Sequence, residues 1–183
     1  MDQNQFASLV LEAEPTIYRV AKSILHREAD VEDAAQEAIL KAYQKRNSLK
    51  DIHAFRPWLT KIVINECYGL IRKGKDTLPM EEGLEFPAEE KESYTDLYEA
   101  LRHLPPKNRI VVVLYYIEGY SVTEIHSILK IPTGTVKSRL SKGRKLLKID
   151  LENKGDGEYE KKINGKTFFL SPVKNFISGW LQH

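Results

Sequence analysis

Apolar side chains recur every three or four positions along most of this chain, which is the period of one face of an α-helix. The first such stretch runs from Gln5 to His26 and contains Pro15, so it predicts either one helix or two short ones. A second runs from Asp30 to Arg46, where Ala35, Ala38, Ile39 and Ala42 form the predicted buried face. Small alanines on that face predict a helix that packs close to its neighbours.

A third helical stretch, FRPWLTKIVINECYGLIRKGK, starts at Phe55, and Pro57 suits its first turn because a missing N–H costs nothing there. Polar side chains recur along it at intervals of four, three and four, which places them in one stripe. Cations, an amide and an aromatic ring in one stripe can hold a phosphate backbone and stack a base. A mostly buried helix with one solvent-exposed side would show the same pattern. The stripe consists of Lys61, Asn65, Tyr68 and Arg72.

The stretches from Tyr94 to His103 and from Pro106 to Glu118 predict two further elements. The run IVVVLYY within the second has strong strand propensity, so its own residues leave helix and strand open. Ser121 then lies three residues before Glu124, which is the spacing of a capping box at the start of a helix. Pro132 suits the first position of another helix after a very short turn. Two short helices joined so tightly indicate a helix-turn-helix.

The second helix of this pair separates its apolar and basic residues onto different faces. Val136, Leu140, Gly143 and Leu147 fall in one narrow sector, which we expect to face the core. Small hydroxyl residues and lysines fall on the other side, and residues 130–148 contain seven bases and no acid. A solvated basic helix could look like this, but a capped partner helix favours DNA binding, with hydroxyls near base edges and cations on phosphates.

Composition is that of an ordinary globular protein, but the charge is unevenly distributed. The 183 residues are 42% hydrophobic and 30% charged, with a net charge of only +2. Residues 75–92 hold seven acids and two bases, and this stretch predicts a flexible acidic linker. Cys67 is the only cysteine, so no internal disulfide can form. Because we find no signal-peptide pattern and no membrane-length apolar run, we expect a cytoplasmic protein with no membrane partner.

No catalytic constellation emerges from the sequence. The five histidines are scattered, no glycine-rich phosphate loop is present, and Cys67 has no histidine near it in sequence. We therefore predict that the chain is not an enzyme and needs neither a cofactor nor a metal.

The motif IPTGTVKSRLSKGRKLL, preceded by EGYSVTEI, resembles the C-terminal helix-turn-helix of sigma factors of the extracytoplasmic-function (ECF) type. In that family this domain reads the −35 promoter element. Two departures are visible, since His126 stands where the family usually has alanine and Lys130 where it often has glycine. The resemblance, with the predicted faces, gives these candidate −35 contacts: Thr135, Lys137, Ser138, Arg139, Ser141, Lys142, Arg144 and Lys145.

The resemblance extends over roughly residues 6–151 and assigns roles to the earlier helices. D-x-E-D-A-A-Q-E-A, in the second helical stretch, resembles the helix that binds the polymerase β′ clamp helices. It implies core-polymerase contacts at Asp33, Gln36, Glu37 and Leu40, although a single exposed leucine is common and by itself means little. WLTKIVINECYGLIRK resembles the family's −10 helix, which makes Lys61, Asn65, Tyr68 and Arg72 candidate −10 contacts. The preceding loop, residues 47–55, would hold a flipped base.

The resemblance also predicts the architecture of the chain. IVVVLYY lies inside the family pattern, so we expect a buried helix there. The predicted fold is all-α, with two small helical domains, residues 1–74 and 94–151, joined by the acidic linker 75–93 and followed by an extension, 152–183. Expected partners are the RNA polymerase core, through its β′ clamp helices and β flap, promoter DNA, and in many members an anti-sigma factor. The alternative is a dimeric helix-turn-helix regulator that binds duplex DNA without polymerase.

The extension lies beyond the resemblance. Asn164-Gly165 predicts a hairpin turn, and Ser171-Pro172 predicts a helix start. An amphipathic stripe follows at Val173, Phe176, Ile177, Trp180 and Leu181. A helix this short is marginal alone, so we expect its apolar face to need a partner surface. Packing on its own C-terminal domain, masking the sigma domains, contacting polymerase and lying on a membrane surface all remain open.

Overall fold

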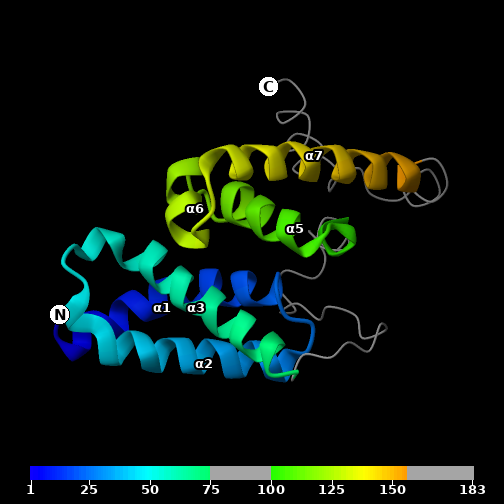
Figure 1. Ribbon diagram of the computed structural model, residues 1–183. Helices are drawn as coiled ribbons and strands as arrows, with labels where there is room; N and C mark the ends of the chain where they lie inside the picture. The colour runs from blue at the N-terminus through cyan, green and yellow to red at the C-terminus, as the bar shows by residue number, and fades with distance from the viewer. Residues whose placement is uncertain (75–99, 156–183) are drawn as a thin grey trace, which may run out of the picture. The chain divides into compact units, whose positions relative to one another are not determined.

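The computed structural model describes residues 1–74 and 100–155, with side chains up to residue 150, and every regular element among them is helical (Figure 1). The predicted all-α fold is confirmed. The predicted acidic linker, residues 75–93, lies outside the described residues, as do residues 156–183 of the predicted extension, whose first four residues continue α7. The elements are α1 (Gln3–Lys22), α2 (Glu28–Lys45), η1 (Arg46–Ser48), η2 (Ile52–Ala54), α3 (Phe55–Arg72), α5 (Pro106–Val112), η3 (Val113–Ile117), α6 (Val122–Leu129) and α7 (Thr133–Gly155).

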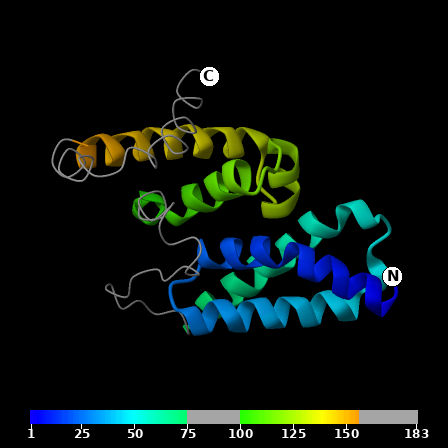
Figure 2. The same ribbon diagram turned by 180° about the vertical axis from the view of Figure 1, so that it is seen from behind.

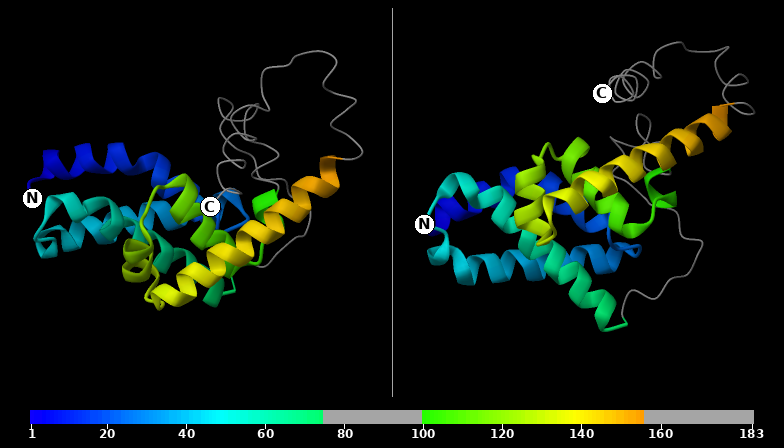
Figure 3. Two further views of the ribbon diagram at one scale, coloured as in Figure 1. Left: turned by 90° about the horizontal axis from the view of Figure 1, so that it is seen from above. Right: turned by 45° about the horizontal axis from the view of Figure 1, so that its top comes forward.

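The chain divides into two compact units. One consists of Met1–Leu84 with Pro106–Leu140, and the other of Glu85–Pro105 with Ser141–His183. Helix α7 is 23 residues long (Figure 3), and the division between the units falls after its residue Leu140. Within the second unit, the ring Nδ1 of His103 lies 2.9 Å from Oδ1 of Asp150. This contact ties the residues before Pro105 to α7.

In the first unit, α1, α2 and α3 pack against one another as a three-helix bundle (Figure 2). Ala34, Ala38 and Ala42 of α2 are fully buried, so small side chains do allow the close packing that the sequence predicted. Ala35 and Ile39 are only half-buried, which corrects the predicted buried face by a fraction of a turn. The Phe6 ring packs edge-on against both Tyr43 and Phe55, at centroid distances of 5.3 and 5.7 Å.

Pro15 and Pro57 lie within α1 and α3. Pro15 is exposed within α1, which remains one 20-residue helix rather than two short ones. Pro57 is the third residue of α3, because this helix begins at Phe55. The first N–H groups of a helix have no intrahelical acceptor, so Pro57 removes no hydrogen bond there.

The run IVVVLYY is helical, as the resemblance predicted, despite its strand propensity. Ile110, Val111, Val112 and Leu114 are all at most 1% exposed, and α5 passes into the π-helical turn η3. Burial on several sides satisfies β-branched residues in a helix as well as in a strand, so tertiary packing outweighs local propensity. Gly119, at a φ of 72°, then turns the chain toward α6.

Candidate nucleic-acid interface

Helix α6 begins with the capping box that the sequence predicted. The Ser121 side chain accepts a hydrogen bond from the backbone N–H of Glu124 at 3.2 Å. The Glu124 carboxylate in turn accepts from the Ser121 backbone N–H at 2.8 Å and from its hydroxyl at 2.7 Å. These bonds, that from the Ser121 side chain first, hold the pKa of Glu124 below its ordinary value. The start of the first helix is therefore fixed by its own sequence.

The two departures from the family pattern meet at the turn between α6 and α7, since Lys130 lies in the turn and His126, a residue of α6, contacts it through its ring. Lys130 adopts a left-handed conformation with a φ of 57°, which is the conformation that favours glycine. His126 is exposed, and its ring Nδ1 lies 2.7 Å from the carbonyl oxygen of Ile131. Helix α7 starts at Thr133, so Pro132 precedes the helix and its carbonyl accepts from the Val136 N–H. This corrects the prediction that Pro132 is the first helical residue.

The two faces of α7 are those predicted. Val136, Leu140, Gly143 and Leu147 are all buried. Asn108 of α5 donates to the carbonyl of Arg139 at 3.0 Å, which anchors the helix on its inner side. The other side is cationic and open along the described part of the helix.

The candidate −35 residues divide into two groups by exposure. Lys137, Ser138, Lys142 and Lys145 are exposed. The half-buried group consists of Thr135, Arg139, Ser141 and Arg144. The Ser138 hydroxyl donates to the Thr135 carbonyl at 3.0 Å, so this hydroxyl is held close to the helix. Exposed lysines around a small hydroxyl can enter a groove and meet phosphates, which is the arrangement that the sequence predicted.

The candidate −10 stripe on α3 is only partly accessible. Asn65 and Arg72 are exposed, whereas Lys61 and Tyr68 are half-buried. Burial lowers the pKa of the Lys61 ammonium group, and the nearby ammonium group of Lys130 lowers it further. Burial likewise raises the pKa of the Tyr68 phenol. The structure thus places part of this stripe against residues of the helix-turn-helix.

The candidate polymerase contacts on α2 share one exposed face. Asp33, Gln36, Glu37 and Leu40 are all exposed, and Leu40 retains 52% of its accessible surface. Lys41 lies beside this face, with its Nζ 3.2 Å from Glu37 and 2.7 Å from Glu66 of α3. The hydrogen bond with Glu66, together with that to Glu37, raises the pKa of Lys41. Lys41 therefore joins the acidic face of α2 to the helix that carries the −10 stripe.

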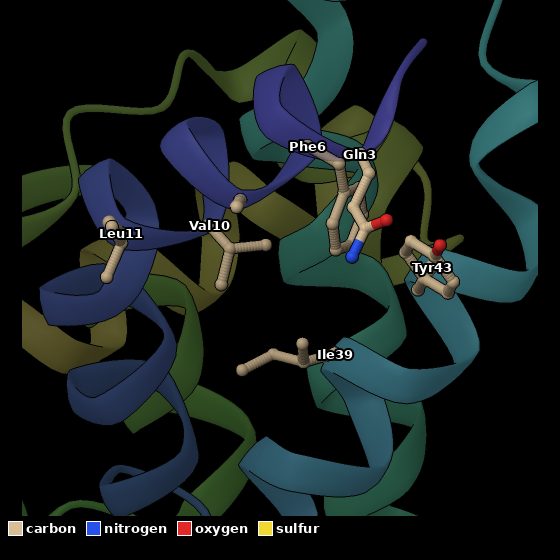
Figure 4. A pocket seen from close by; sticks show the side chains of 7 residues that line it. Gln3, Phe6, Val10, Leu11, Ile39 and Tyr43 are labelled. Carbon is tan, nitrogen blue, oxygen red and sulfur yellow. The ribbon is translucent and has the colours of Figure 1, made fainter.

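An open apolar groove of about 350 Å³ lies between α1 and α2. Figure 4 shows Phe6, Val10 and Leu11 of α1 facing Ile39 and Tyr43 of α2 across it. Leu11 is 68% exposed. The groove adjoins the acidic face of α2, because Ile39 and Gln36 are three residues apart and so are neighbours on the helix surface.

Sequence reasoning missed one buried cluster. The Glu118 carboxylate has a fully buried side chain and accepts from the Thr16 hydroxyl at 2.7 Å, from Arg19 Nε at 2.6 Å and from Arg56 Nη2 at 2.8 Å. Close by, the hydroxyls of Thr60 and Tyr120 lie 2.8 Å apart. The only signal in the sequence was an acid placed directly between an apolar run and a capping box.

In residues 1–74 and 100–155, no three histidine, cysteine, aspartate or glutamate side chains gather as a metal site. No described helix is both long and apolar enough to cross a membrane.

Models of two protein families match the chain. Sigma-70 region 2 matches residues 9–77, which include most of α1 and all of α2 and α3. Sigma-70 region 4 matches residues 94–147, which include α5, α6 and most of α7. The two matches correspond to the two predicted roles, one for the bundle and one for the helix-turn-helix.

Individual proteins support the same assignment. The chain is 32% identical over 171 residues to the ECF RNA polymerase sigma factor SigW of Bacillus subtilis (strain 168), covering 83% of this chain and 91% of SigW. It is 33% identical over 138 residues to the sigma factor SigV of the same organism, covering 73% of this chain and 83% of SigV. Among solved structures, the sigma factor RpoE of Bartonella quintana, crystallised with the anti-sigma factor NepR, superimposes with a TM-score of 0.72. That match has 26% identity and covers 82% of this chain and 98% of RpoE.

Proposed function

This chain belongs to the ECF sigma factors of the sigma-70 family, and we propose that it directs RNA polymerase core to promoters by contacting the −35 and −10 elements through α7 and α3. Members of this family are transcription initiation factors rather than enzymes. The proposal rests on the two family matches. Each match covers the part of the chain whose exposed residues suit the role proposed for it.

The −35 element is assigned to the open face of α7. Lys137, Ser138, Lys142 and Lys145 are exposed there while the opposite face is buried. The half-buried residues Thr135, Arg139, Ser141 and Arg144 complete the proposed surface, and we assign the arginines to phosphates rather than base edges. Lysine and serine side chains on a helix can reach base edges in the major groove.

The −10 element is assigned to the stripe on α3 formed by Lys61, Asn65, Tyr68 and Arg72. Tyr68 supplies an aromatic ring for stacking on an unpaired base, and the cations supply phosphate contacts. This assignment requires Lys61 and Tyr68 to become more accessible than they are in the compact unit.

The core-polymerase surface is assigned to Asp33, Gln36, Glu37 and Leu40, all exposed on one face of α2. An exposed leucine surrounded by acids offers an apolar anchor with a charged rim, which is the composition of many protein interfaces. The expected partner surfaces are the β′ clamp helices for α2 and the β flap for the helix-turn-helix domain. An anti-sigma factor is a further proposed partner, since the RpoE match was solved with one.

The proposed organisation places the polymerase-binding and −10 domain in residues 1–74, a linker in 75–93, the −35 domain in 94–151 and an extension in 152–183. Neither domain needs high affinity by itself, because tethering both to polymerase makes each engagement effectively intramolecular. We place the protein in the cytoplasm, where its polymerase partner works.

Run-off transcription with purified core polymerase and a promoter library tests this function. The full chain should select a subset of promoters that core alone does not transcribe, and the Leu40→Asp chain should select none. Footprinting of the same promoters without polymerase should show weak protection. Strong protection by the free protein as a dimer, with no stimulation of core, would instead identify a regulator that acts alone.

A further inference from the structure

The groove between α1 and α2 leaves apolar surface of the bundle open to water. Six of its seven lining residues have apolar or aromatic side chains, and Gln3 is the other. Val10 and Leu11 face Ile39 across it (Figure 4), and Leu11 is 68% exposed. Its volume of about 350 Å³ is that of a small ligand pocket, which is enough for a few large side chains. Concave apolar surface of this kind is typical of a binding site.

The two ends of the groove differ in charge. Glu14 is exposed one helical turn beyond the last groove residue of α1, and Glu32 is exposed two turns before Ile39 on α2. Because α1 and α2 run in opposite directions (Figure 2), both glutamates lie at the same end of the groove. At the other end, the Arg46 guanidinium lies over the Tyr43 ring at 4.1 Å. An occupant that suits this groove is apolar along its length and basic at the end next to the glutamates.

The C-terminal part of the chain has this chemistry in its sequence. Residues 161–183 contain four bases and no acid, and Lys174 directly follows the first apolar residue of the amphipathic stripe. These residues lie beyond both family matches, which end at residues 77 and 147. An amphipathic segment this short is marginal alone in water, so its apolar side needs a partner surface. We call the following five residues the C-terminal stripe: Val173, Phe176, Ile177, Trp180 and Leu181.

The connection between α7 and the C-terminal stripe is longer than a small domain is wide. Helix α7 ends at Gly155, and the 17 residues 156–172 precede Val173. An extended chain covers about 3.5 Å per residue, so this connection spans up to about 60 Å. A small domain is about 30 Å across. A tethered segment also has an effective concentration that a second copy in dilute solution does not match, which favours a groove in the same chain.

We propose that the C-terminal stripe docks into the α1–α2 groove of its own chain, with its apolar side chains on the groove and Lys174 toward the carboxylates of Glu14 and Glu32. Leu40, the proposed polymerase anchor, does not line the groove. The docked segment therefore lies beside the proposed polymerase face and leaves Leu40 free. The proposal concerns the free protein and does not depend on the proposed function.

Trp180 reports on docking in the full-length protein. The chain has two tryptophans, so Trp58→Phe leaves Trp180 as the only one. In the groove its indole is shielded from water, so its emission should lie at a shorter wavelength, with weaker quenching by acrylamide, than that of a synthetic peptide of residues 171–183. Leu11→Asp adds a carboxylate at the edge of the groove and should shift both properties to the values of the peptide. Ile149→Asp is the matched control and should keep the parent values, because Ile149 is 54% exposed on α7 and does not line the groove.

Several results overturn the proposal. Emission of the parent equal to that of the free peptide, or unchanged emission in the Leu11→Asp chain, shows that the C-terminal stripe is not in the groove. A shift caused by Ile149→Asp places the stripe against the C-terminal domain instead. Emission that depends on protein concentration, with dimers in sedimentation, identifies a second copy of the chain as the occupant.

Two changes near the C-terminus keep the test decisive if Leu11→Asp disturbs the bundle. Phe176→Asp changes a residue outside α1, α2 and α3 and should release Trp180 in the same way, with no further release when it is combined with Leu11→Asp. Lys174→Glu should release it in part at low salt, and Glu14→Lys in the same chain should restore part of the lost docking. Parent-like emission in the Phe176→Asp chain, or no restoration by Glu14→Lys, contradicts the proposed contact. Core polymerase is absent from all these measurements, so failure of the proposed function leaves their outcome unaffected.

Discussion

The ring Nδ1 of His126 lies 2.7 Å from the carbonyl oxygen of Ile131, so the imidazole spans the turn of the helix-turn-helix. A carbonyl oxygen can only accept, so Nδ1 carries the proton in this contact. Between the two residues, Lys130 holds the left-handed conformation with a φ of 57°. The two residues that depart from the family pattern therefore both shape this turn, Lys130 from within it and His126 from α6, and the histidine supplies a bond that the usual alanine could not.

His126→Ala should loosen this turn. Loss of one neutral hydrogen bond costs about 1 kcal/mol, and the orientation of α7 relative to α6 depends on the turn. We expect a lower melting temperature and several-fold weaker binding of holoenzyme to its promoter. His126→Gln retains an amide donor and serves as the control. Equal melting of the His126→Ala and parent chains would show that the bond does not stabilise the turn.

Lys130→Gly should stabilise the same domain. A left-handed conformation costs a residue with a Cβ roughly 1–2 kcal/mol, and glycine avoids that cost while losing part of the gain to greater unfolded-chain entropy. The expected net gain is about 1 kcal/mol or less. Lys130→Ala separates the two effects, since it removes the charge facing Lys61 but keeps the Cβ. Thermal melts of the parent, Lys130→Gly and Lys130→Ala chains compare their stabilities. An equal gain in stability for both variants would show that loss of the Lys130 charge, and not relief of the backbone conformation, is responsible.

Local signals predicted most of the elements. The Ser121 capping box, the buried face of α7 and the exposed Leu40 depend on residues within a few positions of one another, so the helical period is enough to find them. The same reasoning placed Pro132 one residue too far into α7, because a proline before a helix and a proline at its first position look alike in sequence.

The sequence could not predict features that depend on contacts between residues far apart in the chain. Glu118 and Thr16 are 102 residues apart in sequence, and no local pattern pairs a carboxylate with so distant a hydroxyl. The half-burial of Lys61 and Tyr68 has the same origin, because a polar stripe on a helix does not show what packs over it. The strand propensity of IVVVLYY misleads for a related reason, since burial in η3 and α5 is decided by the whole fold.

Leu40→Asp should abolish binding to core polymerase without unfolding the chain. Leu40 is 52% exposed on α2, so an aspartate there meets water in the free protein but an apolar partner in the complex. A central apolar anchor typically contributes about 2 kcal/mol or more, which is roughly a thirtyfold loss of affinity. Pull-down with core polymerase and circular dichroism measure the two properties.

Leu11→Asp is the matched control for that experiment, because Leu11 is an equally apolar residue that is 68% exposed on α1. We expect it to bind core like the parent. If both substitutions abolish binding, a general effect on the bundle is responsible. If only Leu40→Asp loses helicity, Leu40 is a structural residue and the assigned face is wrong.

The capping box should make the stability of the helix-turn-helix depend on pH in the acid range. Hydrogen bonds from Ser121 hold the pKa of Glu124 below its ordinary value of 4.5. Its contribution is therefore fully present above that pH and is lost as the pH falls through the lower folded value. Because Glu124 is largely exposed, solvent screening limits this contribution to a few tenths of a kcal/mol. Melts of the parent and Glu124→Gln chains should differ slightly at pH 7 and converge as the pH falls through the lowered pKa of Glu124; a gap that widens in acid would contradict this account.

Lys142→Ala on α7 should change promoter preference rather than only affinity. Lys142 is exposed on the side opposite the buried residues Val136 and Leu140, where a lysine can reach a base edge in the major groove. Its loss should cost about 1–3 kcal/mol at one position of the −35 element and relax the preference at that position. Arg139→Ala should instead weaken all promoter variants similarly and reduce the dependence of binding on salt, because a half-buried arginine at the side of the helix is expected to meet phosphates rather than base edges. Holoenzyme binding to a set of single-base −35 variants, repeated at two salt concentrations, separates the two effects. If Lys142→Ala weakens every variant equally, the lysine contacts only the DNA backbone and the assignment of base-reading residues on α7 is wrong.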